Sequence, residues 1–253
     1  MTPGGHGLDD HLEVSGLTLA THLARPASAG ALPAVILCHD FPTPPRGSLA
    51  SGLTFPELAD RVARSGWLAY TFNFRGTGGS EGDFSINGWL DDQRAVVELL
   101  AARDDVSGIW IVGTGVGGTL AIVTAARDRR VQGVAALGGQ ASLDDWARDS
   151  NRFLEHCRRM DVIRSTGFPR DAQAWAREIR QLDAVGAAGR LAPRPFLLLH
   201  GSDDELVPVS DARKLADAHG DAELHVVPTA GRRLRHDPRA IATLLGWLDR
   251  QVS

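Results

Sequence analysis

The feature that most constrains the fold is the alternation of short apolar runs with amphipathic segments along most of the chain. Runs that are apolar at consecutive positions, separated by segments with helical spacing, are typical of a mainly parallel sheet with helices on both faces. The strand-like runs are residues 34–39, 67–74, 109–112, 131–137, 195–200 and 223–227. The helix-like segments are residues 54–66, 89–102, 116–126, 210–219 and 238 to the end. The pattern predicts an α/β fold.

Two segments depart from this alternation. Residues 12–23 alternate between apolar and polar side chains around Ser15-Gly16, which predicts an antiparallel hairpin at one edge of the sheet. Residues 142–192 contain no buried-strand run but several helix-like stretches, which we interpret as a helical lid above the strand ends. A chain of 253 residues suits one sizeable core, so we expect a single domain over residues 1–253 with an eight-stranded sheet.

The amino-acid composition argues against several classes of partner and cofactor. Lys and Arg total 27 against 31 Asp and Glu, a net charge of −4, and the arginines are scattered, so we expect neither nucleic acid nor a membrane as partner. Cys38 and Cys157 cannot form a disulfide framework and lack metal-ligand spacing, so no metal and no cofactor is expected. The first ten residues do not resemble a signal peptide, and no run approaches the ~18 apolar residues of a spanning helix. We expect a cytoplasmic protein.

Five motifs follow predicted strands, in an order that is informative. They are residues 39–42 (HDFP), 73–82 (NFRGTGGSEG), 113–118 (GTGVGG), 200–208 (HGSDDELVP) and 229–237 (TAGRRLRHD). In this order the chain resembles the α/β-hydrolase superfamily over nearly its whole length. The resemblance implies an α/β-hydrolase fold whose reactive groups gather beyond the carboxyl ends of the strands. It also implies a nucleophile elbow of the form G-x-S-x-G, between Gly113 and Gly117.

The triad positions implied by the resemblance are filled unusually. Gly115 stands where the nucleophilic serine belongs, and Arg232 stands where the base histidine belongs. Only the acid, Asp204, is retained. Arginine stays protonated and has no lone pair with which to accept a proton. We expect Arg232 to form an ion pair with Asp204 instead.

The loop that would form the oxyanion hole also departs from the family, because Asp40 replaces the usual glycine between His39 and Phe41. The hole would consist of the backbone N–H groups of Phe41 and Val116, which survive side-chain substitution. A carboxylate beside them would oppose a developing negative charge unless Arg232 or another cation neutralises it. We interpret His39 as a residue that braces this loop.

These substitutions predict a pseudo-hydrolase. Loss of the serine or the histidine of such a triad costs on the order of 10⁶ in rate, and losses at the two positions are not additive. The chain would then act by binding a small molecule in a lid-covered pocket, or a partner; the sequence leaves a homo-oligomer open.

Two other functions remain open from the residues. One is an active hydrolase or lyase that acts on a small ester or amide-type substrate without a triad, with proton transfer through Asp40, His39 or Asp204. The other is nucleotide binding at Gly113–Gly118, which matches G-x-G-x-x-G. The strand after it lacks the acidic end that a dinucleotide site requires, which disfavours this reading.

Four residues near the motifs are assigned structural roles. Cys38 is interpreted as a core residue, because no basic neighbour would activate its thiol. His200 is expected to support the Asp204 turn, and His236 to lie at the surface before the helix cap at Asp237. Arg75 is expected to pair with a nearby carboxylate.

Overall fold

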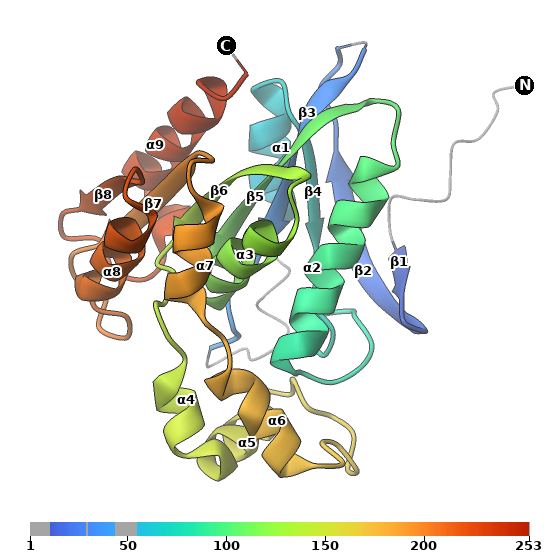
Figure 1. Ribbon diagram of the computed structural model, residues 1–253. Helices are drawn as coiled ribbons and strands as arrows, with labels where there is room; N and C mark the ends of the chain where they lie inside the picture. Colours follow the sequence, from blue (N-terminus) through green and yellow to red (C-terminus); the bar gives the residue numbers. More distant parts are fainter. Residues whose placement is uncertain (1–10, 29, 44–54, 253) are drawn as a thin grey trace, which may run out of the picture.

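An eight-stranded sheet forms the centre of the protein, and helices cover both of its faces (Figure 1). The computed structural model describes residues 11–28, 30–43 and 55–252. The strand order is β1-β2-β4-β3-β5-β6-β7-β8. The strands are β1 (His11–Val14), β2 (Leu17–Ala24), β3 (Leu32–Cys38), β4 (Leu68–Phe72), β5 (Val106–Thr114), β6 (Val131–Leu137), β7 (Phe196–Gly201) and β8 (Glu223–Val227). The predicted α/β class and the eight strands are confirmed.

The N-terminal hairpin is the antiparallel part of the sheet. β1 pairs with β2 and β2 with β4, both antiparallel, whereas every pair from β4 to β8 is parallel. The hairpin turns at Ser15 and Gly16, with φ of 52° and 78°. Positive φ at two central residues is the geometry whose twist matches that of the flanking strands. The hairpin predicted from alternation around Ser15-Gly16 is therefore confirmed.

The helices divide between the two faces of the sheet. They are α1 (Phe55–Arg64), α2 (Ile86–Ala101), α3 (Val116–Arg127), α4 (Asp144–Arg148), α5 (Ser150–Arg159), α6 (Ala172–Arg180), α7 (Ala184–Leu191), α8 (Val209–His219) and α9 (Pro238–Asp249), with a short 3-10 helix η2 (Leu234–His236). α1 and α9 share one buried cluster, and α2, α3, α7 and α8 cover the other face.

Local capping explains where two of the helices begin. α2 starts three residues before the predicted 89, because the Ser85 side chain accepts a hydrogen bond from the N–H of Gly88. α9 starts where predicted: the Asp237 carboxylate accepts from the N–H of Arg239 at 2.8 Å, and Pro238 occupies the first turn. The first residue of the helix-like segment predicted at residues 54–66 lies outside the described residues.

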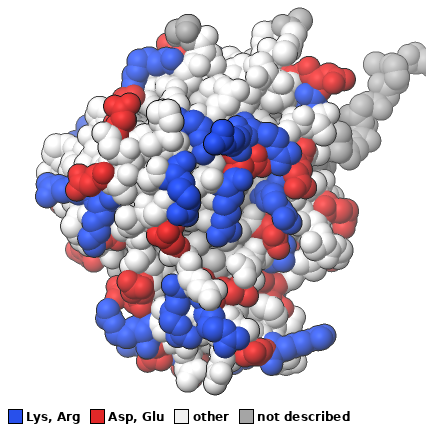
Figure 2. Space-filling model, in the orientation of Figure 1, with Lys and Arg blue, Asp and Glu red and all other residues white. Residues whose placement is uncertain are grey.

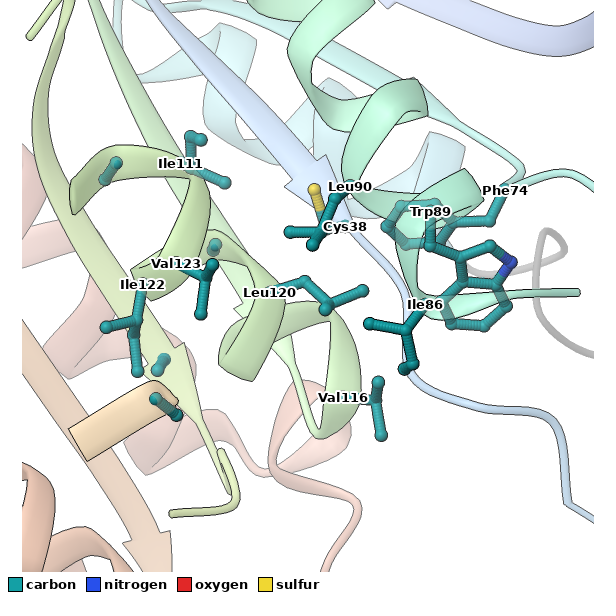
Figure 3. Close-up of a cluster of buried hydrophobic side chains, with 14 of the residues drawn as sticks. Cys38, Phe74, Ile86, Trp89, Leu90, Ile111, Val116, Leu120, Ile122 and Val123 are labelled. Carbon is teal, nitrogen blue, oxygen red and sulfur yellow. The ribbon is translucent and has the colours of Figure 1, made fainter. Parts of the chain in front are cut away.

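A cluster of buried side chains lies beneath the loop that follows β3 (Figure 3). Cys38 at the end of β3 packs there with Trp89 of α2 and Leu120 of α3. The rings of Phe74 and Trp89 stack with centroids 4.3 Å apart, and both are fully buried. Dense packing of this kind has low compressibility, so the loop above it rests on a rigid base.

The lid consists of α4, α5 and α6, which lie beyond the carboxyl ends of the strands (Figure 1). Its centre is aromatic: Trp146 and Phe153 stack with centroids 4.2 Å apart, and Trp175 lies 5.7 Å from Phe153. Residues 184–191 of the predicted insertion form α7, which packs against α3 and α8 instead of the strand ends.

The surface carries mixed charge. On the face in Figure 2, Lys and Arg gather over the upper middle, with Asp and Glu lying between them. Charged side chains of the protein form short ion pairs, such as Arg130 with Asp128 at 2.6 Å and Arg103 with Asp105 at 2.9 Å. Within the described part of the chain, no helix combines the length and apolar character needed to span a bilayer.

The glycine-rich loop after β4 is held by a buried ion pair. Arg75 donates from Nε and Nη2 to Oδ1 of Asp92, at 2.9 and 2.7 Å, and its backbone N–H donates to Oδ2 at 2.9 Å. The Asp92 side chain is 0% exposed and that of Arg75 is 14% exposed. The expected pairing of Arg75 is confirmed, and it joins the loop to α2.

This pair generates a stability prediction. Asp92→Ala should lower the free energy of unfolding by about 3–5 kcal/mol, because it leaves a poorly solvated guanidinium without a counter-charge. The matched control is Asp91→Ala, whose carboxylate is 46% exposed and pairs with Arg94 on the surface of the same helix. It should cost no more than about 1 kcal/mol. Urea denaturation measures both; equal losses would contradict the prediction.

Candidate functional site

The turn between β5 and α3 has the geometry of a strand-to-helix elbow. Gly115 has φ 49° and ψ −123° and directly precedes the first turn of α3. Residues other than glycine adopt this region only with strain. A side chain at Gly113 would overlap the backbone of Gly117, and one at Gly117 would overlap the carbonyl oxygen of His39. The glycines therefore serve close packing of backbone segments, as the elbow motif predicts.

The side chain of Asp40 occupies the predicted oxyanion hole. Its Oδ1 accepts hydrogen bonds from the N–H of Phe41 at 2.7 Å and from the N–H of Val116 at 2.9 Å. These are the two donors that the hydrolase resemblance assigns to the hole. Both N–H groups meet at one oxygen atom of the chain's own Asp40 carboxylate.

Arg232 binds the other oxygen of the same carboxylate. Its Nε and Nη2 donate to Oδ2 of Asp40 at 2.9 and 2.7 Å. The ion pair predicted between Arg232 and Asp204 is therefore wrong. The guanidinium pairs with the carboxylate that already lies in the hole, so the cation neutralises Asp40, as the charge argument required.

Three unusual residues of this site depend on one another. A Cβ atom built on Gly115 would overlap the carboxylate of Asp40. A serine side chain at position 115 and the Asp40 carboxylate in its present position would therefore occupy the same space. With Gly115 in place, Asp40 can reach both Val116 and Arg232, from segments far apart in the sequence.

Asp204 is held in its loop without a charged partner in the described ranges. Its Oδ1 accepts from the N–H groups of Leu206 and Val207, both at 3.0 Å. Its Oδ2 is buried and has no hydrogen-bond partner among the residues that the structure describes. His200 supports this loop, as predicted, with Nε2 bonded to the carbonyl oxygen of Val207 at 2.8 Å.

His39 braces the backbone of the Asp40 loop, as predicted. Nδ1 donates to the carbonyl oxygen of Asp40 at 2.7 Å, and Nε2 accepts from the N–H of Phe74 at 3.1 Å. An Nε2 that accepts a backbone N–H carries no proton, so the ring is neutral. Burial, with a smaller effect of the positive charge of Arg235, lowers the pKa of His39 to about 4, while the hydrogen bond to the Asp40 carbonyl opposes the shift.

A hydroxyl lies near this histidine but does not form a catalytic pair with it. Thr77 Oγ1 is 3.1 Å from His39 Nε2, and it donates its proton to the carbonyl oxygen of Phe74 at 2.6 Å. Thr77 is 0% exposed and His39 1%, so both lie beneath the loop and not in a substrate site. The arrangement is a structural hydrogen-bond network.

Arg235 is a site neighbour that motif reasoning missed. It lies on η2 with its guanidinium 5.8 Å from the centre of the Phe55 ring. Burial lowers its pKa, and the negative charge of Asp40 opposes that shift. A helical turn after Arg232 brings it to this place; the sequence signal was the basic run at residues 232–235.

The remaining candidates have structural surroundings. Burial raises the pKa of the Cys38 thiol to about 12, so it is a core residue and not a nucleophile. His236 is exposed on η2, next to the Asp237 cap, as predicted. In the described ranges no group of three His, Cys, Asp or Glu side chains is placed to hold a metal ion.

The buried state of His39 predicts a pH dependence of stability. In the unfolded chain His39 binds a proton near pH 6.5, whereas in the folded protein it does so only near pH 4. The unfolded state therefore binds more protons between these values, and the melting temperature should fall as the pH drops from about 7 to about 5. His39→Gln should weaken that dependence, whereas the control His225→Gln, at an exposed histidine, should not. An unchanged dependence in His39→Gln would argue against it.

Comparison with known proteins agrees with the resemblance. The family model described as serine aminopeptidase, S33, matches residues 46–165, which include the elbow but neither Asp204 nor Arg232. A curated relative, 2-hydroxymuconate semialdehyde hydrolase of Pseudomonas sp. (strain CF600), is 26% identical over 233 residues. That match covers 77% of this chain and 78% of the relative.

Solved structures share the fold over almost the whole chain. Est1E from Butyrivibrio proteoclasticus, with bound ferulic acid, superposes with a TM-score of 0.72 at 18% identity, covering 96% of this chain and 97% of that one. The meta-cleavage product hydrolase of Pseudomonas fluorescens IP01 gives 0.67 at 20% identity, covering 96% and 98%. With the strand order and the elbow, these matches show that the chain has the α/β-hydrolase fold. The family model and the curated relative support its membership of the α/β-hydrolase superfamily.

Proposed function

We propose that this α/β-hydrolase superfamily member does not carry out triad hydrolysis and acts by binding a small molecule or a partner. The observation that carries the proposal is the position of Asp40: its carboxylate occupies both donors of the oxyanion hole, and Arg232 stands where the base would stand.

The chemistry of acyl transfer supports this reading. Hydrolysis requires an attacking group, a base that accepts its proton, and donors free to stabilise a developing oxyanion. Gly115 has no side chain to attack, and Arg232 cannot accept a proton. A negative carboxylate already fills the place where a negative oxygen would form. Each of the three requirements is unmet at its family position.

The neighbours that carry the name hydrolase do not weaken the proposal. One curated relative is named 2-hydroxymuconate semialdehyde hydrolase, at 26% identity. Identity at this level, and fold similarity at 18–20%, accompany changes of function within one fold. The substitutions at 40, 115 and 232 are properties of this chain's own residues.

The two other functions have less support. Proton transfer without a triad would need an ionisable group open to substrate, whereas Asp40 is bound to Arg232 and both nitrogens of His39 are engaged. A pyrophosphate at Gly113–Gly118 would need the N–H groups at the start of α3, and that of Val116 already binds Asp40.

Cellular location and partners follow from weaker observations. Cys38 and Cys157 are both free and buried, which suits a reducing compartment, and we infer a cytoplasmic protein on that basis. The net charge of −4 and the mixed surface charge favour a small-molecule ligand, under the lid, over a polyanion.

One test of the proposed function uses the unmodified protein. With short-chain p-nitrophenyl esters, the rate should be no more than about 10³- to 10⁴-fold above that of the uncatalysed reaction in water. This is the acceleration that an oxyanion hole and substrate binding still supply when a triad is disabled. Asp204→Asn should leave that rate unchanged, because no imidazole depends on Asp204. Substantial turnover that Asp204→Asn reduces would overturn the proposed function, since it would reveal a working acid.

Another test attempts to restore ester hydrolysis by substitution. Gly115→Ser/Arg232→His should stay inactive, because the introduced serine overlaps the carboxylate of Asp40. Adding Asp40→Gly removes the overlap and frees both N–H donors. The buried Oδ2 of Asp204 has no partner among the described residues, and it is the acceptor that a base histidine of the family would use. The triple variant should exceed the double by at least about 10-fold in ester hydrolysis, less than the full worth of a hole donor. Equal rates in folded double and triple variants would contradict the assigned role of Asp40.

A further inference from the structure

We propose that the Asp40 side chain is the internal occupant of a carboxylate-binding site, and that this site takes the carboxylate group of a small molecule when Asp40 is displaced. The inference rests on the proposed function, because it identifies the ligand chemistry of the same site. It adds a ligand class that the loss of the triad does not by itself imply.

The donors around Asp40 match a carboxylate on both oxygens. Oδ1 accepts from two backbone N–H groups, those of Phe41 and Val116, at 2.7 and 2.9 Å. Oδ2 accepts from Nε and Nη2 of Arg232, at 2.9 and 2.7 Å. A guanidinium edge is planar and donates in parallel, which is the geometry that a planar carboxylate satisfies best. The four contacts form a complete receptor for one –COO⁻ group.

The two backbone donors are fixed by contacts other than those with Asp40's carboxylate. His39 binds the Asp40 carbonyl and so orients the peptide whose N–H belongs to Phe41. The N–H of Gly115 donates to the carbonyl oxygen of Leu137 at 2.8 Å, which holds the turn before Val116. A receptor whose donors are held in this way binds without first paying for their ordering.

The positive surroundings favour an anion over a neutral ligand. Besides Arg232, the partly buried Arg235 interacts electrostatically with Asp40. Removal of the Asp40 carboxylate would leave Arg232, 19% exposed, and two backbone donors without their acceptor. Such groups bind an incoming carboxylate in preference to an amide of the same shape, because a charged acceptor forms the stronger hydrogen bonds.

Access is consistent with exchange. The side chains of Asp40 and Arg232 are 14% and 19% exposed, so the pair is not sealed in the core. The Asp40 side chain beyond Cα is chemically an acetate on a one-bond tether. Its tethering gives it a high effective concentration at the receptor, so a free carboxylate competes poorly against it in the unmodified protein.

The test is calorimetric titration of Asp40→Ala with sodium acetate, at constant ionic strength maintained with chloride. Acetate should bind Asp40→Ala at least about 10-fold more tightly than it binds the unmodified protein, because the tethered competitor is gone. Acetamide, which has the same shape without the charge, should bind at least about 10-fold more weakly than acetate. Equal acetate affinity in the two proteins would overturn the proposal.

Two controls separate the receptor from general charge effects. Asp203→Ala removes one exposed carboxylate from the neighbouring loop, whose contact is with Ser202, and should bind acetate no better than the unmodified protein. Asp40→Ala/Arg232→Gln should lose at least about 10-fold in acetate affinity relative to Asp40→Ala, since the acetate loses the charged donors that Arg232 supplies to Oδ2 of Asp40 in the unmodified protein. Retained affinity in the double variant would show that Arg232 is not part of the receptor.

Folding is monitored in the same samples. Asp40→Ala should melt below the unmodified protein, and acetate should raise its melting temperature more than acetamide does, by binding the folded state. If Asp40→Ala does not fold, Asp40→Gly, with the residue that the family usually carries, takes its place. Failure of acetate binding would refute the receptor and leave the ester measurements untouched, whereas turnover sensitive to Asp204→Asn would refute the proposed function itself.

Discussion

The structure of the site depends on one charge-assisted contact set, in which the carboxylate of Asp40 joins Phe41, Val116 and Arg232. These residues come from the loop after β3, the start of α3 and the segment after β8. A carboxylate that is only 14% exposed is stable there because each of its oxygens accepts hydrogen bonds from two N–H donors. Without Arg232 the same carboxylate would oppose the packing of the three segments; with it, the carboxylate links them.

The parallel sheet makes this meeting possible. β3, β5, β7 and β8 run in the same direction, so their following loops lie on one edge. The glycines at 113 and 117 then allow α3 to approach the end of β3 closely enough for a hydrogen bond from Val116 to Asp40. Backbone packing, and not side-chain chemistry, sets the distance between the two halves of the site.

Much of this was accessible from the sequence. Apolar runs and their spacing predict the strands, the hairpin and most helices, because burial on a sheet leaves a direct signature in the chain. The motifs place Gly115, Asp204 and Arg232 at one edge. They do not decide which carboxylate Arg232 selects, because Asp40 and Asp204 follow strands on either side of the elbow. That choice depends on the space above Gly115, which only coordinates reveal. Arg235 was missed for a similar reason, since a 3-10 turn sets its direction.

Phe41 connects two parts of the molecule that the chain keeps apart. Its backbone N–H holds Asp40, and its ring lies 5.0 Å from Trp146 and 5.6 Å from Phe153, centroid to centroid, in the lid. The backbone N–H of this single residue thus binds the Asp40 carboxylate, while its ring packs in the aromatic cluster of the lid. A shift of α4 or α5 relative to the sheet would displace the ring of Phe41 and, with it, the peptide N–H that binds the carboxylate. The position of the lid and the geometry of the carboxylate site are therefore coupled through one side chain.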